Sequence, residues 1–290
     1  MGKKRLIIID SNSIIHRAFH ALPPLTTKKG ELVNAVYGFL LVFLKVLREL
    51  KPDFVFATFD FPGPTFRHKE FKEYKATRPK APAELYNQIP KIKEILKFFN
   101  VPIFEKEGFE ADDLIGTISR LAPKKQILPE IETIILSGDL DTLQLINPQT
   151  KVYLLKRGVK DTILYDEKAV QERYGLSPEQ LVDFRALKGD PSDNIPGVPS
   201  IGEKTAQKLI KEFGSLENLY SNLDKLKPAL GAKLKEYKDQ AFFSKNLAKI
   251  NQNVEIDIDF KKGEWRNYDR EKISQIFKEL EFFSLIKRLP

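Results

Sequence analysis

The amino-acid sequence predicts an α/β protein with a mostly parallel central sheet flanked by helices, followed by a helical lobe. In the first part of the chain, short runs of Ile, Val, Leu and Phe that fit fully buried strands alternate with longer runs that fit helices. After about residue 175 the strand-like runs largely stop and helical patterns follow one another. We therefore expect an α/β core over 1–174 and a helical lobe over 175–290.

Each element follows from its local pattern. Strands are expected where buried apolar runs are short, at 5–10, 53–60, 101–105 and 133–138. Helices of the core are expected at 34–50, 84–99, 110–121 and 141–146. The second half is expected to hold helices at 177–188, 203–213, 215–226, 228–250 and 269–288, with one short strand at 254–260. Residues 61–83 fit neither pattern, because they are rich in Pro, Lys and Arg and have no sustained apolar face.

Composition narrows the classes of function. A hydrophobic fraction of 42% and a charged fraction of 30% are typical of a folded soluble chain. The absence of cysteine excludes disulfides, a thiolate nucleophile and a cysteine zinc site. The basic start has too short an apolar run for a secretory signal, and the apolar stretch at 35–50 is interrupted by Lys45 and Arg48. We expect a cytoplasmic protein without a membrane partner, and the net charge of +8 suits a polyanionic one.

Acidic residues follow the ends of three predicted strands, begin the helix at 110–121 and recur in a later loop at 190–193. Asp10, Asp60 and Asp139 each end a strand, and ligands of open α/β sheets bind at the carboxyl ends of the strands. A fourth strand leads into the first turn of helix 110–121, which is also acidic. Nine carboxylates are therefore candidates for one site: Asp10, Asp60, Glu110, Asp112, Asp113, Asp139, Asp141, Asp190 and Asp193.

Crowded carboxylates favour a divalent metal. They repel one another and cannot all ionise without a cation. With no cysteine or nearby histidine, oxygen ligands indicate Mg²⁺, or Mn²⁺ in its place, and paired divalent ions are suited to phosphodiester hydrolysis. The alternatives are structural: acids stabilise the first turn of a helix, cap helices and form Asx turns. We favour metal because several independent strand ends carry an acid and basic partners at matching spacing are missing.

Two further segments fit nucleic acid. The basic residues after Asp60 are interleaved with aromatic side chains, which is how single strands are held, although a solvated basic loop is the alternative. The segment "IPGVPSIGEKTAQKLI" combines Pro-Gly turns with the start of a helix, whose N–H groups bind phosphate without reading bases. An ordinary helix–turn–helix corner is the alternative there.

Five segments together resemble the 5′ nuclease (flap endonuclease) family, in particular the 5′-to-3′ exonuclease domains of bacterial DNA polymerase I. They are "LIIIDSNSIIHRAF", "FATFD" with "FRHKEFKEYKATR", "EADDLIGT", "SGDLDTLQL" and "LKGDPSDNIPGVPSIGEKTA". The resemblance covers nearly the whole chain. It implies a PIN-like nuclease core, a helical arch at about 61–88, and a helix-hairpin-helix element at about 186–213.

The resemblance also implies roles for individual residues. One metal would be held by Asp10, Asp60, Glu110 and Asp112, and a second would be served by Asp113, Asp139, Asp141, Asp190 and Asp193. Lys75 and Arg78 would be catalytic, because they steer the scissile phosphate, and Tyr74 would stack on a displaced base. DNA contacts are expected from Arg67, Tyr74, Lys75, Arg78, Gly197, Gly202, Lys204 and Thr205. The hairpin carbonyls would bind K⁺.

The implied function is a structure-specific 5′-to-3′ exonuclease and 5′-flap endonuclease of replication and repair. Its partners would be DNA flaps, duplex ends and nicks, and a DNA polymerase in cis or in trans; a monomer associated with the bacterial nucleoid is expected. Three alternatives stay open: a non-catalytic binder of branched DNA, a metal-dependent ribonuclease, and a haloacid-dehalogenase-like phosphohydrolase. A haloacid-dehalogenase-like phosphohydrolase would be expected to have a second acid two residues after Asp10, where this chain has Asn12.

Overall fold

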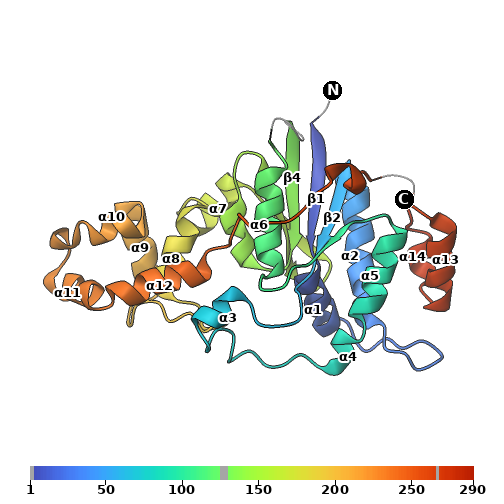
Figure 1. Ribbon diagram of the computed structural model, residues 1–290, viewed down its shortest axis with the longest axis horizontal. Helices are drawn as coiled ribbons and strands as arrows, with labels where there is room; N and C mark the ends of the chain where they lie inside the picture. The colour runs from blue at the N-terminus through green and yellow to red at the C-terminus, as the bar shows by residue number, and fades with distance from the viewer. Residues whose placement is uncertain (1–2, 125–129, 266–267) are drawn as a thin grey trace.

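The computed structural model describes residues 3–124, 130–265 and 268–290, and its centre is a single six-stranded sheet. The strand order is β3-β2-β1-β4-β5-β6, with all neighbours parallel except the last pair. The strands are β1 Lys4–Asp10, β2 Phe54–Thr58, β3 Ile103–Phe104, β4 Ile131–Ser137, β5 Thr150–Arg157 and β6 Asp161–Tyr165. The prediction of a mostly parallel sheet flanked by helices is confirmed (Figure 1).

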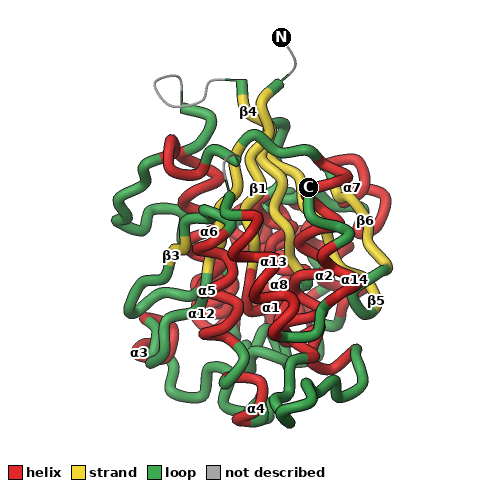
Figure 2. Tube along the Cα trace, turned by 90° about the vertical axis from the view of Figure 1, so that its right-hand side faces the viewer, coloured by secondary structure: helices red, strands yellow, loops and turns green. Residues whose placement is uncertain are grey.

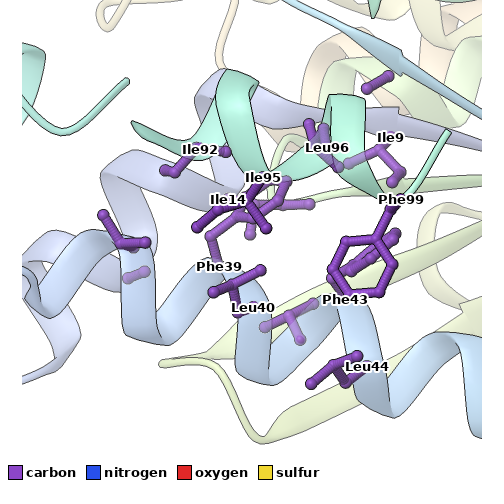
Figure 3. Packing of buried hydrophobic residues seen from close by; sticks show 14 of the residues in the cluster. Ile9, Ile14, Phe39, Leu40, Phe43, Leu44, Ile92, Ile95, Leu96 and Phe99 are labelled. Carbon is purple, nitrogen blue, oxygen red and sulfur yellow. The ribbon is translucent and has the colours of Figure 1, made fainter. Parts of the chain in front are cut away.

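Both faces of the sheet are covered, which explains why β1 is apolar at successive positions. Ile7 and Ile9 face α1 (Ser11–Ala21), α2 (Asn34–Leu50) and α5 (Ile89–Phe98). Figure 3 shows Ile9 in one cluster with Leu96 of α5, Phe99 directly after this helix, and Phe43 of α2. Leu6 and Ile8 face the opposite way, towards α6 (Ala111–Leu121). A strand buried on both faces needs no alternation of polar and apolar residues.

The helical lobe has a hydrophobic cluster of its own. Figure 1 shows it extending to one side of the sheet, and its cluster joins Phe184, Leu209 and Leu234. Its helices are α8 Gln180–Lys188, α9 Glu203–Phe213, α10 Leu216–Tyr220, α11 Pro228–Glu236 and α12 Lys238–Ala248, and α7 Glu167–Tyr174 leads into it. Short 3₁₀ turns lie at Leu140–Leu145, Leu223–Lys225 and Phe260–Gly263.

The sequence missed some elements and misplaced others. Helix α1 and strands β5 and β6 were not expected, and no strand forms at 254–260. The expected helix 84–99 divides into α4 (Ala83–Tyr86) and α5, which has a proline in its first turn. The expected helices 228–250 and 269–288 also divide, the latter into α13 Arg270–Glu279 and α14 Phe283–Ile286.

The prediction that the helical lobe extends over 175–290 is wrong for its last part. Ile273, Phe277 and Leu285 belong to the same cluster as α2 and α5, so α13 and α14 pack on the α/β core. Their apolar faces resemble those of lobe helices, and the sequence alone does not say which cluster covers them.

The predicted arch region lies at the carboxyl ends of the strands. It contains only two short helices, α3 (Phe66–Glu70) and α4, joined by irregular chain. In Figures 1 and 2, α3 and α4 lie at the end of the sheet opposite the N-terminus. In the part of the chain that is described, no helix is both long and apolar enough to cross a membrane.

We predict that Gly38→Ala destabilises the fold. Alanine normally improves a helix interior by about 1 kcal/mol. At Gly38 the added Cβ would lie 2.6 Å from Ala18 Cβ and 2.8 Å from Leu22 Cδ1, so α1 and α2 must separate. Such overpacking costs about 1–3 kcal/mol, and urea unfolding should show a lower free energy of unfolding. Equal or higher stability would contradict this close helix contact.

Candidate active site

Five of the nine candidate carboxylates line one pocket of about 250 Å³ at the carboxyl ends of the strands. They come from β1, from the segments that follow β2 and β4, and from the start of α6: Asp10, Asp60, Glu110, Asp112 and Asp139. We call this the acid pocket. Parallel pairing of β2, β1 and β4 places these chain positions side by side, as the sequence predicted.

Asp10 is a buried residue of the acid pocket that also stabilises the local backbone. It ends β1 and caps α1, accepting a hydrogen bond from the Ser13 backbone N–H at 3.2 Å. The Ser137 hydroxyl also donates to it. Burial, with the charges of Asp139 and Asp60, raises the pKa of Asp10 to about 6 in spite of these hydrogen bonds. The buried carboxylate therefore lacks a full counter-charge.

Asp60 and Asp112 share this deficit of positive charge. Asp60 accepts a hydrogen bond from the Ala111 N–H at 2.8 Å and keeps contact with solvent, yet partial desolvation raises its pKa. Desolvation and the charges of Asp10 and Asp139 raise the pKa of Asp112 well above its ordinary range. This part of the pocket favours binding of a cation.

Glu110 has the opposite electrostatics. Lys75 Nζ donates to its Oε1 at 2.7 Å, and Arg67 Nη1 lies 3.5 Å from its Oε2. Burial opposes ionisation of Glu110, but these two cations outweigh burial and lower its pKa. The sequence expectation that basic partners are missing beside the acids is therefore wrong for this residue. Lys75 follows no spacing rule relative to Glu110, since the two lie 35 positions apart.

The segment 73–78 closes over this side of the acid pocket, and we call it the strap. Lys75 N–H donates to the Asp193 carbonyl at 3.0 Å, and Asn194 Nδ2 donates to the Glu73 carbonyl at 2.8 Å. Arg78 pairs with the Asp193 carboxylate. Lys75 has a left-handed φ of 56°, an uncommon conformation for a residue with a side chain. Both Lys75 and Arg78 line the acid pocket.

The Tyr74 side chain is buried beneath the strap and is not accessible to a nucleobase. Its hydroxyl lies 3.2 Å from a Glu110 oxygen and 3.1 Å from an Asp193 oxygen, and its side chain is only 3% exposed. Burial and the two carboxylates raise its pKa, so it stays a neutral hydrogen-bond donor. The prediction that Tyr74 stacks on a displaced base is contradicted in this conformation.

Asp113 and Arg67 form a buried ion pair behind the acid pocket. Arg67 donates from both terminal nitrogens to the two Asp113 oxygens at 2.8 Å. Asp113 also accepts the Glu110 and Asn251 N–H groups, and it is 0% exposed. The structure therefore contradicts Asp113 as a metal ligand, because both oxygens already have partners. It likewise contradicts a DNA contact from Arg67, which is 2% exposed.

The remaining acids are paired with the protein's own cations. Arg185 of α8 pairs with Asp141 and lies 3.5 Å from an Asp190 oxygen. Burial opposes ionisation of Asp190, but hydrogen bonds from Ser192 and the charge of Arg185 lower its pKa. Within residues 3–124, 130–265 and 268–290, no three Asp, Glu or His side chains come together closely enough to hold an ion in this arrangement.

The predicted hairpin lies in the lobe, directly after the loop that carries Asp190 and Asp193. Gly197 has a left-handed φ of 61°, and a Cβ there would lie 2.3 Å from the Gly189 nitrogen, so only glycine fits. Gly202 is the N-cap of α9 and faces open space. Lys204 is exposed and Thr205 is half-buried, so the start of this helix is accessible to a ligand.

Two residues of the site escaped sequence reasoning. His16 lines the acid pocket, although no nearby histidine was expected. The sequence pattern could have predicted its position, because Asn12, Ser13 and His16 fall on one face of a helix that begins directly after Asp10. Arg185 is positioned by α8, more than 40 residues beyond Asp141, and no local pattern points to that pairing.

Comparison with known proteins decides the family. A family model described as "5′-3′ exonuclease, N-terminal resolvase-like domain" matches residues 5–175, and one described as "5′-3′ exonuclease, C-terminal SAM fold" matches residues 176–271. The chain belongs to the 5′-3′ exonuclease family. The DNA polymerase I of Bacillus subtilis is 44% identical over 288 residues, which cover 99% of this chain. The same alignment covers 32% of that protein, so the chain spans about a third of the length of this relative.

Solved structures of 5′ nucleases share the fold of this 5′-3′ exonuclease family member. A T5 5′-exonuclease with bound zinc ions superimposes with a TM-score of 0.72 at 20% identity, covering 86% of this chain and 90% of the other. A bacteriophage T5 flap endonuclease in a complex with DNA and metal ions gives a TM-score of 0.71 at 19% identity, with the same coverage.

We predict that Asp10 makes stability fall with rising pH in the metal-free protein. Its pKa is about 6 in the folded state against 3.8 ordinarily, so the folded state binds the proton more tightly. The stability it contributes is fully present below pH about 4 and is lost as pH rises through about 6. The difference of about two pH units corresponds to up to about 3 kcal/mol.

Urea unfolding in EDTA between pH 4.5 and 8 tests this prediction. Asp10→Asn should make the decline with pH shallower, since Asp60 and Asp112 still contribute to it, and should raise the free energy of unfolding at pH 8, whereas the exposed Asp257→Asn should leave both unchanged. A wild-type profile that does not decline across this interval would contradict the assignment of Asp10 as a buried, incompletely compensated charge.

Proposed function

We propose that this 5′-3′ exonuclease family member is a metal-dependent, structure-specific 5′ nuclease. It would remove nucleotides from 5′ ends of duplex DNA and cut 5′ flaps during replication and repair. The observation that carries the proposal is the acid pocket, where Asp10, Asp60 and Asp112 have raised pKa values and lie beside a basic strap. Branched DNA substrates and a DNA polymerase partner, in cis or in trans, rest on family membership and on the polymerase relative.

Divalent metal fits the charge and the donor chemistry of the acid pocket, and its carboxylates would have to draw closer together to hold an ion. Hard oxygen ligands with uncompensated negative charge suit Mg²⁺, with Mn²⁺ as a substitute, and the T5 5′-exonuclease of the same fold binds divalent ions. We propose that Asp10, Asp60, Glu110 and Asp112 hold one ion and that Asp139, Asp141, Asp190 and Asp193 serve a second. Such ions lower the pKa of a bound water and offset negative charge on the phosphate.

The strap supplies positively charged side chains that can bind the scissile phosphate. Lys75 and Arg78 line the acid pocket, and in this structure they compensate Glu110 and Asp193. We propose that they exchange these carboxylates for the scissile phosphate when substrate binds. Arginine and lysine are suited to this role because their charge-assisted hydrogen bonds to phosphate oxygens are short and strong.

The helical lobe would hold the duplex away from the cut. The accessible start of α9, with Gly202, Lys204 and Thr205, offers backbone N–H groups and positive charge to a phosphate. K⁺ at the carbonyls of this hairpin, and a monomeric state, remain part of the proposal on the family resemblance alone. Arg67 and Tyr74 are excluded from the DNA contacts because they are buried.

Two other functions are less well supported. A non-catalytic binder of branched DNA would be expected to lose acids of the pocket, and the five carboxylates that line it are all present. A metal-dependent ribonuclease would share the same chemistry. Comparing cleavage of DNA and RNA flaps of equal sequence separates it from the proposed function, since preferred cleavage of RNA would favour the ribonuclease.

The proposal predicts that Asp112→Asn abolishes cleavage without unfolding the protein. The substitution removes one charge from a crowded set, so stability should hold, while a lost metal ligand should lower the rate of flap cleavage by at least about 100-fold. The assay is cleavage of a labelled 5′-flap DNA with Mg²⁺, with exposed Asp257→Asn as the control. Cleavage unaffected by Asp112→Asn would refute the site assignment.

A second prediction concerns the spacing between the acid loop and the hairpin. Asp190 and Ile195 exchange both backbone hydrogen bonds at 2.9 Å, and Asn194 anchors the loop to the strap. Inserting one glycine between Asn194 and Ile195 breaks this bridge and shifts the hairpin relative to Asp193. We expect cleavage to fall at least about 10-fold, in line with the cost of small misplacements in active sites, while duplex affinity changes little.

The matched control is a glycine inserted at the exposed turn after Ser221, in the same lobe. Single-turnover cleavage and duplex binding in Ca²⁺ would be measured for both insertions. Equal losses of cleavage and binding at the Asn194 site would show that the loop serves binding only.

A further inference from the structure

A second pocket, of about 430 Å³, is lined by residues of α3, α6 and the chain that leaves α12. Figure 1 shows this chain crossing α6. Phe66 at the start of α3 and Arg120 near the end of α6 form two of its sides. Asn246 of α12 and the connection after this helix form the rest, the latter with Lys249, Asn251, Gln252 and Asn253. We call it the amide pocket. Its volume lies within the range of about 300–1,000 Å³ that is usual for ligand sites.

The backbone of this connection is fixed to α6. The Asn251 N–H donates to Asp113 at 2.8 Å, the Val254 N–H donates to the Thr117 hydroxyl at 3.1 Å, and Arg120 Nε donates to the Gln252 carbonyl at 2.7 Å. These contacts hold the main chain in place from both sides of the pocket. The fold therefore does not need the side-chain amides of the connection to define its path.

Those amides keep unused hydrogen-bonding capacity. Among the described residues, the side chains of Gln252 and Asn253 make no hydrogen bond, and Asn251 uses only its oxygen, which accepts the Asn253 N–H at 2.8 Å. The Lys249 ammonium makes no hydrogen bond or ion pair in the described part of the chain, and only the more distant charge of Glu217 acts on it. Several hydrogen-bond donors and acceptors therefore line the amide pocket without making hydrogen bonds that stabilise the fold.

This combination of groups matches a nucleotide of single-stranded DNA. A side-chain amide presents a donor and an acceptor together, as does the exposed edge of an unpaired base. Arg67 covers one face of the Phe66 ring, so the ring can offer only its other face to a base, and cations such as Lys249 and Arg120 can hold the phosphate. In a duplex, by contrast, the Watson–Crick edges are already used, so paired DNA would not employ these amides.

The Arg67 side chain links the amide pocket to the acid pocket. Arg67 lies 3.5 Å from Glu110, which lines the acid pocket, and donates to the Lys249 carbonyl at 2.9 Å, which belongs to the amide pocket. We propose that the amide pocket binds a nucleotide of the single-stranded 5′ extension of the substrate, beyond the phosphate that is cut. This inference rests on the proposed function, because it assigns part of the substrate to a new subsite.

The test compares DNA flaps of one and ten nucleotides. Binding is measured by fluorescence anisotropy in Ca²⁺, without turnover, for the wild type and for Gln252→Ala/Asn253→Ala and Lys249→Gln. Loss of the hydrogen bonds to one base edge is worth about 1–3 kcal/mol, so the ten-nucleotide flap should bind about 5- to 150-fold more weakly to the variants. Affinity for the one-nucleotide flap should stay unchanged, as should both affinities for the controls Gln149→Ala and Gln171→Ala, which alter exposed amides elsewhere.

Every outcome decides the proposal. Equal loss for both flaps, or no loss for either, overturns it. Cross-linking from 5-iodouracil placed along the flap should map to residues 249–253. Because binding is read without cleavage, a length-dependent loss in a protein that cuts no flap would support the subsite while refuting the proposed nuclease activity.

Discussion

The buried ion pair between Arg67 and Asp113 is the interaction on which the rest of the site depends. Arg67 donates to both oxygens of Asp113 and to the carbonyls of Leu247 and Lys249, and Asp113 also accepts the Glu110 N–H. Burying two charges is costly unless each has a full set of partners, and here each has one. The pair thereby joins α3, which precedes the strap, to the first turn of α6 and to the end of α12, and fixes their relative positions.

Around that anchor, the acids divide into two electrostatic groups. Asp10, Asp60 and Asp112 have raised pKa values, because burial or partial desolvation and mutual repulsion act on them without enough positive charge nearby. Glu110 and Asp190 have lowered pKa values, because lysine and arginine side chains compensate them. One side of the site is therefore ready to accept cations, whereas the other already holds cations that a phosphate can attract.

The sequence could predict the positions that the sheet dictates and could not predict those set by packing. Asp10, Asp60 and Asp139 were found because parallel strands end at one edge. Asp112 and Asp113 are adjacent, and successive residues on a helix point in different directions, so the pattern could not tell which one faces the pocket. Arg67 and Tyr74 lie in a segment without periodicity, where nothing local distinguishes a buried anchor from a DNA contact. The alternation of apolar and polar residues at 254–260 is typical of a strand, but this segment does not pair with any strand of the sheet.

The partners of Arg67 also bear on the order in which the protein can assemble. Its carbonyl acceptors lie 180 and 182 positions further along the chain. During synthesis the strands, the strap and α6 leave the ribosome long before those carbonyls exist, since domains emerge from the N-terminus onward. A nascent chain therefore carries all the acids of the pocket while the arginine behind them still lacks half of its acceptors. The geometry described here becomes available only late in synthesis, after the chain has been extended beyond Lys249.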